Sequence, residues 1–138
     1  MVSTKSLTAA ALAGLASASP LISKINTPPT VVAGDNMTVT LNTSIYIQNW
    51  EDFSIIWGLA PTTLSGQGSE IYVGTQIGYT NLYGTDIEKL NSFTVDVAIP
   101  ESQPAGDWLL VAAVPYLVGA SGSTNLRSFN STIKVTAA

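Results

Sequence analysis

Residues 92–108, SFTVDVAIPESQPAGDW, carry the pattern that decides the fold. In the first half of this stretch every second residue is apolar, and these residues are Phe93, Val95, Val97 and Ile99. A period of two predicts a β-strand with one face toward a core and the other toward water. Pro100, Pro104 and Gly106 then break the alternation, which predicts a turn before the next strand begins.

The same succession of strand and turn recurs along most of the chain. Turn-forming residues separate seven strand-like segments, which are 21–25, 36–47, 53–59, 71–79, 92–99, 107–118 and 128–136. No stretch has the apolar period of an amphipathic helix, although residues 86–91 are long enough for one helical turn. Short strands between regular turns predict an all-β sandwich or barrel.

Two turns favour the sandwich over the barrel. Residues 31–35, VVAGD, lead into a strand as the A–B corner of immunoglobulin-like domains does, and residues 99–108 resemble their E–F corner. In such domains an aromatic ring packs near the start of strand F, and Trp108 takes that place here. Because cysteine is absent, we predict an immunoglobulin-like antiparallel β-sandwich of about seven strands without disulfides.

The segment 107–118 is apolar on both faces. Leu109, Val111 and Ala113 are apolar, and so are the residues between them. One interpretation is a central strand whose outer face lies under a loop or under the N-terminal segment. The other is that one face meets a partner or a second copy of the chain.

The first 18 residues are typical of a secretory signal peptide. Lys5 precedes a weakly apolar run at residues 7–15, and Ala16-Ser17-Ala18 supplies the small residues that a signal peptidase requires. This run is too short to span a bilayer, which takes about 20 residues. A buried N-terminal helix is the alternative. We expect a signal peptide at residues 1–18 and one β-sandwich domain at residues 19–138, secreted to the extracellular space.

Composition and charge exclude several classes of function. The chain has five basic and nine acidic residues, and loss of Lys5 with the leader would change the net charge from −4 to −5. An acidic chain is unsuited to a phosphate backbone, so we expect no nucleic acid as partner. Histidine is absent as well as cysteine, which excludes His-based triads and Cys nucleophiles and argues against zinc, copper and haem. We expect no cofactor, no metal, no catalytic residues and no stable membrane insertion.

Any catalysis would have to use carboxylates. Glu51 and Asp52 are adjacent, and Asp86 and Glu88 are two residues apart. Neighbouring carboxyls on one loop rarely face each other across a sugar, as a glycosidase requires. Calcium is an alternative, but the sequence has no Asp-x-Asp-x-Asp-Gly loop. We therefore interpret both pairs as solvated carboxylates in turns.

Three sequons for N-glycosylation, at Asn36, Asn42 and Asn130, provide a check on the strand assignment. Each asparagine shares its strand parity with threonines that the alternation places on an outer face. A glycan must face solvent, so the sequons agree with the alternation. We predict glycosylation at these three positions, with unused sequons as the alternative.

Residues 45–53, IYIQNWEDF, mix aromatic rings with amide and acid groups at a connection between strands. Trp50 has the wrong parity to join the apolar face of residues 53–59. An exposed aromatic ring beside hydrogen-bonding groups is typical of recognition surfaces. The alternative is that this loop covers the end of the sandwich and Trp50 caps the core. We predict that the residues that bind a partner are Tyr46, Gln48, Asn49, Trp50 and Asp52.

This run, followed by residues 55–58, IIWG, and preceded by the short leader, resembles the necrosis-inducing secreted protein family of fungal plant-pathogen effectors. The specific part is Tyr-Ile-Gln-Asn-Trp-x-Asp-Phe, and chain length and strand order are similar over most of the mature chain. The resemblance implies a small secreted non-enzyme that binds receptor-associated kinases, dampens plant immune signalling and can provoke cell death. It implies no catalytic residues.

We therefore expect a secreted, non-enzymatic fungal effector that binds a host plant protein, a receptor-associated kinase, and suppresses pattern-triggered immunity; transfer into host cells is left open. The alternative is a secreted cell-wall or polysaccharide-binding β-sandwich module, because exposed aromatic rings stack on sugars. The candidate rings are Tyr72, Tyr79 and Tyr83. A third hypothesis is a surface protein that self-associates through residues 107–118.

Overall fold

The computed structural model describes residues 19–46, 50–64, 71–119 and 122–138, so the predicted leader lies outside the described residues. In this part of the chain the strands are β1 (Ser19–Asn26), β2 (Thr30–Val32), β3 (Asn36–Tyr46), β4 (Trp50–Asp52), β5 (Ser54–Pro61), β6 (Thr75–Asn81), β7 (Ser92–Ala98), β8 (Gly106–Val118) and β9 (Ser123–Thr136). All seven predicted segments contain a strand, and β2 and β4 are short additions. Residues 86–91 form no helical turn; a short 3-10 helix, η2, covers Thr62–Leu64.

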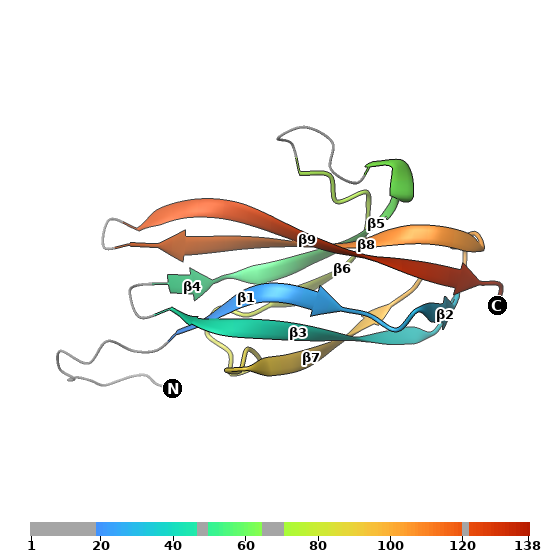
Figure 1. Cartoon of the computed structure of the whole chain (residues 1–138). Helices are drawn as coiled ribbons and strands as arrows, with labels where there is room; N and C mark the ends of the chain where they lie inside the picture. The colour runs from blue at the N-terminus through green and yellow to red at the C-terminus, as the bar shows by residue number, and fades with distance from the viewer. Residues whose placement is uncertain (1–18, 47–49, 65–70, 120–121) are drawn as a thin grey trace.

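Two sheets form the sandwich (Figure 1). In the smaller sheet β3 lies between β1 and β7, and the larger sheet has the order β2-β9-β8-β5-β6, with β4 paired to the end of β8. Strands β2 and β9 run parallel, and the other pairs are antiparallel. In immunoglobulin nomenclature these sheets are A-B-E and A′-G-F-C-C′, which confirms the predicted sandwich. No helix among the described residues is long and apolar enough to cross a bilayer.

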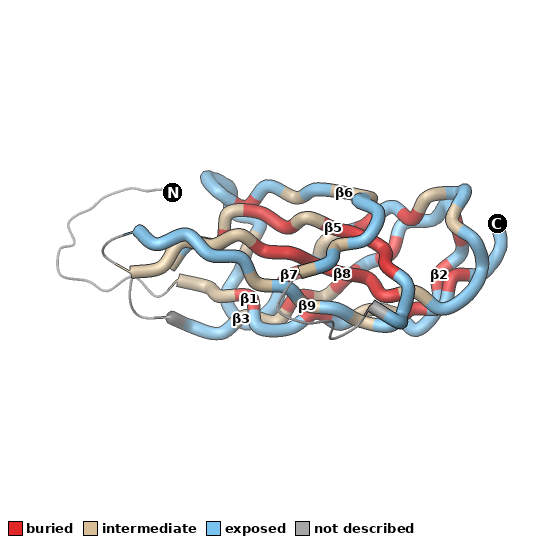
Figure 2. Tube along the Cα trace, turned by 90° about the horizontal axis from the view of Figure 1, so that it is seen from above, coloured by how far each residue is buried: buried red, intermediate tan, exposed pale blue. Residues whose placement is uncertain are grey.

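The core lies between the two sheets and follows the alternation of the sequence (Figure 2). Met37, Val39 and Leu41 of β3 are buried, and Trp57 of β5 is 1% exposed. Burying one such aliphatic side chain contributes about 1.5–3 kcal/mol. A core of this extent is sufficient to hold a domain of this size without disulfides.

The turn before β8 has the geometry predicted for the E–F corner. Trp108 packs against the core, and its indole Nε1–H donates a hydrogen bond to the carbonyl oxygen of Pro104 at 3.0 Å. In immunoglobulin-like domains the corner tyrosine bonds the backbone a few residues upstream in the same way. Trp108 therefore replaces that tyrosine, as predicted.

The outer face of β8 is buried, as expected for a central strand. Leu109 and Val111 form a small buried cluster with Ala60 of β5. Residues 71–74 were predicted to begin a strand, but they lie against β5 instead, and β6 starts at Thr75. The carbonyl group of Val73 lies so close to Gly58 that a Cβ at that position would overlap it. This close approach explains why the strand begins later than predicted.

The three sequon asparagines occupy outward-facing strand positions. Asn36 and Asn130 are exposed, and Asn42 is half-buried, with its side chain accepting a hydrogen bond from Asn26. The strand parity predicted for them is therefore confirmed. Glycosylation itself stays a prediction.

Candidate functional site at the β1–β4 end of the sandwich

Strand β4 owes its orientation to one extra residue before β5. Asp52 pairs with Tyr116 and Ile56 pairs with Ala113. Between these two pairs the β4–β5 segment advances by four residues, whereas β8 advances by three. A β-bulge of this kind reverses the side-chain parity of a strand. Trp50 and Asp52 therefore point toward the interior of the sandwich, whereas the alternation alone predicts that Trp50 lies off the apolar face.

Asp52 is a buried carboxylate with two hydrogen-bond donors. It is 1% exposed. Its Oδ2 accepts from the backbone N–H of Ile22 at 3.0 Å, and its Oδ1 accepts from the indole Nε1–H of Trp50 at 2.9 Å. Burial of a carboxylate is costly unless such donors compensate for lost water. Asp52 thus connects β4 to β1 of the opposite sheet and holds the Trp50 ring in place.

Arg127 of β9 completes this end of the sandwich. Its guanidinium carbon lies 4.9 Å from the ring centroid of Phe129, and 5.7 and 5.8 Å from the centroids of Trp50 and Tyr116. The rings of Trp50 and Tyr116 are stacked at 4.4 Å. Arg127 Nη1 also donates to the carbonyl oxygen of Ile22 at 2.9 Å. Both backbone polar groups of Ile22 are therefore bonded by charged side chains of the larger sheet, an arrangement we name the Ile22 clamp.

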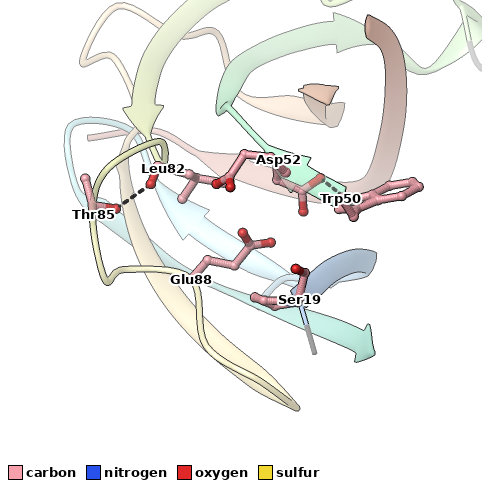
Figure 3. Close-up of a pocket in the computed structure, with 8 residues that line it drawn as sticks. Ser19, Trp50, Asp52, Leu82, Thr85 and Glu88 are labelled. Carbon is pink, nitrogen blue, oxygen red and sulfur yellow. Dashed lines mark hydrogen bonds between the residues drawn. The ribbon is translucent and has the colours of Figure 1, made fainter. Parts of the chain in front are cut away.

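A pocket of about 160 Å³ opens beside Asp52 (Figure 3). The connection between β6 and β7 brings Glu88 to this pocket, and Figure 3 shows its carboxyl group between Asp52 and Ser19. The Thr85 hydroxyl donates to the carbonyl oxygen of Leu82 at 2.8 Å and holds this connection in a turn. The lining residues are Ser19, Pro20, Trp50, Glu51, Asp52, Leu82, Thr85 and Glu88.

The electrostatics of the pocket are dominated by Glu88. Burial, a hydrogen bond to Asp52 and the negative charges of Asp52 and Glu51 raise the pKa of Glu88 from 4.5 to about 11. Glu88 is therefore protonated at neutral pH. Its Oε2 is buried and has no hydrogen-bond partner. The interpretation of these carboxylates as solvated is wrong for Asp52 and Glu88, because the β6–β7 connection folds back over β4.

The carboxyls of Asp52 and Glu88 lie close to each other in the pocket, and a hydrogen bond between them contributes to the raised pKa of Glu88. The two carboxyls of a glycosidase stand about 5–9 Å apart to admit a sugar. In residues 19–46, 50–64, 71–119 and 122–138 no group of three or more acidic side chains is arranged to hold a metal ion.

The predicted partner-binding residues are placed unequally. Trp50 is half-buried and Asp52 is buried, so they lie within the end of the sandwich. Tyr46 ends β3, where its backbone pairs with Ser19. Gln48 and Asn49 lie outside the described residues. Contact of these residues with a partner stays a prediction.

Sequence reasoning missed the groups that surround Trp50 and Asp52. Tyr116, Arg127 and Glu88 come from β8, β9 and the β6–β7 connection, each more than 30 residues from β4. The acidic pair at residues 86 and 88 was a weak signal for Glu88. Nothing local marks Tyr116 or Arg127, because only the packing of the sheets brings them to Trp50.

Comparison with known proteins places the chain in a family. The model of the Nis1 family matches residues 18–134. The chain is 36% identical over 127 residues to necrosis-inducing secreted protein 1 of Colletotrichum orbiculare, covering 92% of this chain and 75% of that protein. It is 34% identical over 133 residues to necrosis-inducing secreted protein 1 of Colletotrichum higginsianum, covering 91% and 86%.

Among solved structures, a superoxide reductase (neelaredoxin) from Ignicoccus hospitalis aligns over 85% of this chain and 82% of its own. The TM-score is 0.49 and the sequence identity is 13%, which supports no inference about this chain. The family match and the two relatives span nearly the whole described fold, and the chain therefore belongs to the Nis1 family, a family of necrosis-inducing secreted proteins of fungi.

Proposed function

We propose that this protein is a secreted effector that binds a receptor-associated kinase of the host plant and thereby suppresses pattern-triggered immunity. Membership of this family supports the proposal that the protein is a secreted effector. The observation that carries the binding proposal is the rigid aromatic end of the sandwich, where Trp50 is stacked on Tyr116 and bonded to Asp52.

A ring held in this way is suited to recognition. The Trp50 side chain is already ordered by two contacts, so binding would cost little further conformational entropy. The neighbouring Glu51 is exposed and adds negative charge to this end. A net acidic protein is steered toward a basic patch on a partner, which speeds encounter. These features fit a protein surface with basic groups around an apolar pocket.

Binding can be measured directly with the chain of residues 19–138 and a purified receptor-associated kinase domain, by isothermal titration calorimetry. We expect Trp50→Ala to weaken binding about tenfold or more, as truncation of an interface hot spot does. Glu101→Gln, which removes one exposed acid away from this end, should leave the affinity unchanged. An equal affinity for a folded Trp50→Ala variant would remove this end of the sandwich from the interface.

Suppression of immunity needs its own measurement. The oxidative burst of leaf tissue after treatment with a microbial elicitor should be reduced by the wild-type chain. Trp50→Phe is a useful second variant, because it keeps an aromatic ring against Tyr116 but loses the indole N–H and one of the two fused rings. A burst that is unchanged by the wild-type chain would contradict the proposed suppression, whatever the binding data show.

A second candidate, polysaccharide binding, is favoured by three tyrosines on the surface. The exposed fractions of Tyr72, Tyr79 and Tyr83 are 47%, 60% and 61%. Exposed rings stack on sugar faces, although a row of rings on one face is needed for tight binding. Pull-down on chitin and β-glucan tests this function, and retention that is lost in the triple alanine variant would favour it over kinase binding.

A further inference from the structure

Ser19 forms part of the wall of the acidic pocket. It is the first residue of β1 and lines the pocket together with Asp52 and Glu88. In Figure 3 it lies beside the carboxyl group of Glu88. Its backbone pairs with Tyr46 of β3. The start of β1 is therefore fixed relative to the two carboxyl groups.

The lining of the pocket is acidic. It includes the carboxyls of Glu51, Asp52 and Glu88, and none of the described residues that line it is a lysine or an arginine. Oε2 of Glu88 is buried and has no hydrogen-bond partner. A buried acceptor in this state destabilises the fold, and it does so more strongly when it is charged. A positively charged donor in this pocket would remove that cost.

The charged groups on the neighbouring elements do not supply this donor. Arg127 of β9 is directed to the carbonyl oxygen of Ile22 and to three rings, one of them that of Tyr116 on β8. In the same connection as Glu88, Lys89 lies 4.0 Å from the exposed carboxylate of Asp86. Neither basic side chain lines the pocket.

The predicted processing of the chain would create a cation at this position. Ala16-Ser17-Ala18 predicts cleavage of the peptide bond between Ala18 and Ser19. Hydrolysis by one water molecule leaves a carboxylate on Ala18, which departs with the leader. The nitrogen of Ser19 becomes a primary amine, which takes up a proton to form an ammonium group at neutral pH.

We propose that this new α-ammonium group binds in the acidic pocket and donates hydrogen bonds to the carboxylates of Glu88 and Asp52. Removal of the leader at this one bond would then complete the β1–β4 end of the fold. The ammonium group would hold the first residue of β1 next to the Ile22 clamp. The inference depends on the predicted cleavage site and not on kinase binding.

The proposal has an electrostatic signature that a purely structural Ser19 would lack. A positive charge next to two carboxyls stabilises their ionised forms and is itself stabilised. The pKa of Glu88 should therefore fall from its raised value when the ammonium group is present. The pKa of the ammonium group should rise above the ordinary value of an α-amino group, which is about 8.

The test compares three forms of the purified protein by NMR titration and thermal unfolding. One begins at Ser19, one begins at Ala18 and so moves its ammonium group outward by a residue, and one carries an acetylated Ser19. For the chain that begins at Ser19 we expect an α-amino pKa at least one unit above its ordinary value. This form should also have the highest melting temperature, by about 4 °C or more, since loss of a buried ion pair has effects of this size.

Two variants separate the ion pair from a general effect on folding. Glu88→Gln should return the α-amino pKa to its ordinary range, and Asp86→Asn, which changes the exposed carboxylate of the same connection, should leave it raised. An α-amino pKa that is ordinary and insensitive to Glu88→Gln would overturn the proposal. So would mass spectrometry showing that the secreted protein begins at a residue other than Ser19.

Discussion

The Oδ2 atom of Asp52 lies 3.0 Å from the backbone nitrogen of Ile22 and accepts its hydrogen. The two residues belong to opposite sheets and are 30 residues apart in the chain. The pairing of β1 with β3 shifts register between Ile22 and Lys24. Asp52 therefore supplies to the outer edge of β1 the acceptor that a further strand would have provided.

Asp52→Ala should destabilise the protein by about 2–3 kcal/mol, because it leaves the buried Ile22 N–H without its acceptor and removes the hydrogen bond to the half-buried Trp50 indole. Urea unfolding of the purified chain measures this loss. The matched control is Asp96→Ala, which removes an exposed carboxylate that accepts from the Thr38 hydroxyl at 2.7 Å. Its cost should be under about 1 kcal/mol. Equal losses of unfolding free energy in the two variants would contradict the proposed role of Asp52 in connecting β4 to β1.

Arg127→Met should lower the free energy of unfolding by about 1–3 kcal/mol, since it keeps the apolar stem of the side chain but removes the bond to Ile22 and the charge over the rings. The tryptophan fluorescence of the protein should change as well, because the guanidinium group lies 5.7 Å from the ring of Trp50. Lys24→Met alters an exposed cation of β1 and is expected to have little effect. An Arg127→Met variant with an unchanged free energy of unfolding would show that the Arg127 side of the Ile22 clamp contributes nothing to stability.

Gly58→Ala should cost about 3 kcal/mol, because its Cβ would overlap the backbone of Val73 and force residues 71–74 away from β5. Gly78→Ala is the matched control on the paired strand, where the nearest atom to the new Cβ would be a Trp57 carbon at 3.6 Å, an ordinary contact. Thermal unfolding measures the loss of stability, and the binding of a hydrophobic dye detects apolar surface that is exposed when residues 71–74 move away from β5. If both variants are equally stable, residues 71–74 do not pack as described.

Stability should depend on pH through Glu88 in a chain whose N-terminus is acetylated. Its pKa is raised from 4.5 to about 11, so the folded state holds this proton more tightly than the unfolded state does. The resulting stabilisation is complete below pH 4.5 and is lost as the pH rises toward 11. The free energy of unfolding should therefore fall with rising pH in this window, by up to about 1.4 kcal/mol per pH unit. Urea unfolding at several pH values gives this slope.

Glu88→Gln should abolish that slope, because glutamine resembles the protonated carboxyl and does not titrate. Asp86→Asn should retain it, since the Asp86 carboxylate is exposed. A slope that survives in Glu88→Gln would assign the pH dependence to another group.

Glycans should be added at Asn36 and Asn130, which are exposed, when the protein is secreted from a eukaryotic host. Asn42 is half-buried and bonded to Asn26, so we expect lower occupancy there. Digestion with a glycosidase followed by mass spectrometry measures each site. Asparagine-to-glutamine variants are the controls, and full occupancy at Asn42 alone would contradict the order expected from exposure.

The fold was predictable because it depends on a local pattern. The alternation of Met37, Val39 and Leu41 with hydroxylated neighbours selects one buried face wherever the strand lies. Trp108, four residues after Pro104, determines the corner in the same local way. Each of these predictions needs only the period of two and the chemistry of a turn, so each could be made without knowledge of the partners across the core.

The candidate site was not predictable in the same way, because it depends on one inserted residue and on three distant ones. The bulge between Asp52 and Ile55 reverses the side-chain parity of the strand, and no residue type in this stretch indicates a bulge. Once Trp50 and Asp52 face inward, only the packing of two sheets decides that Arg127 and Glu88 meet them. The sequence by itself determined which side chains are apolar and where the chain turns. The tertiary structure decided which charged side chains lie together at the β1–β4 end of the sandwich, since burial and proximity exist only after the two sheets have packed against each other.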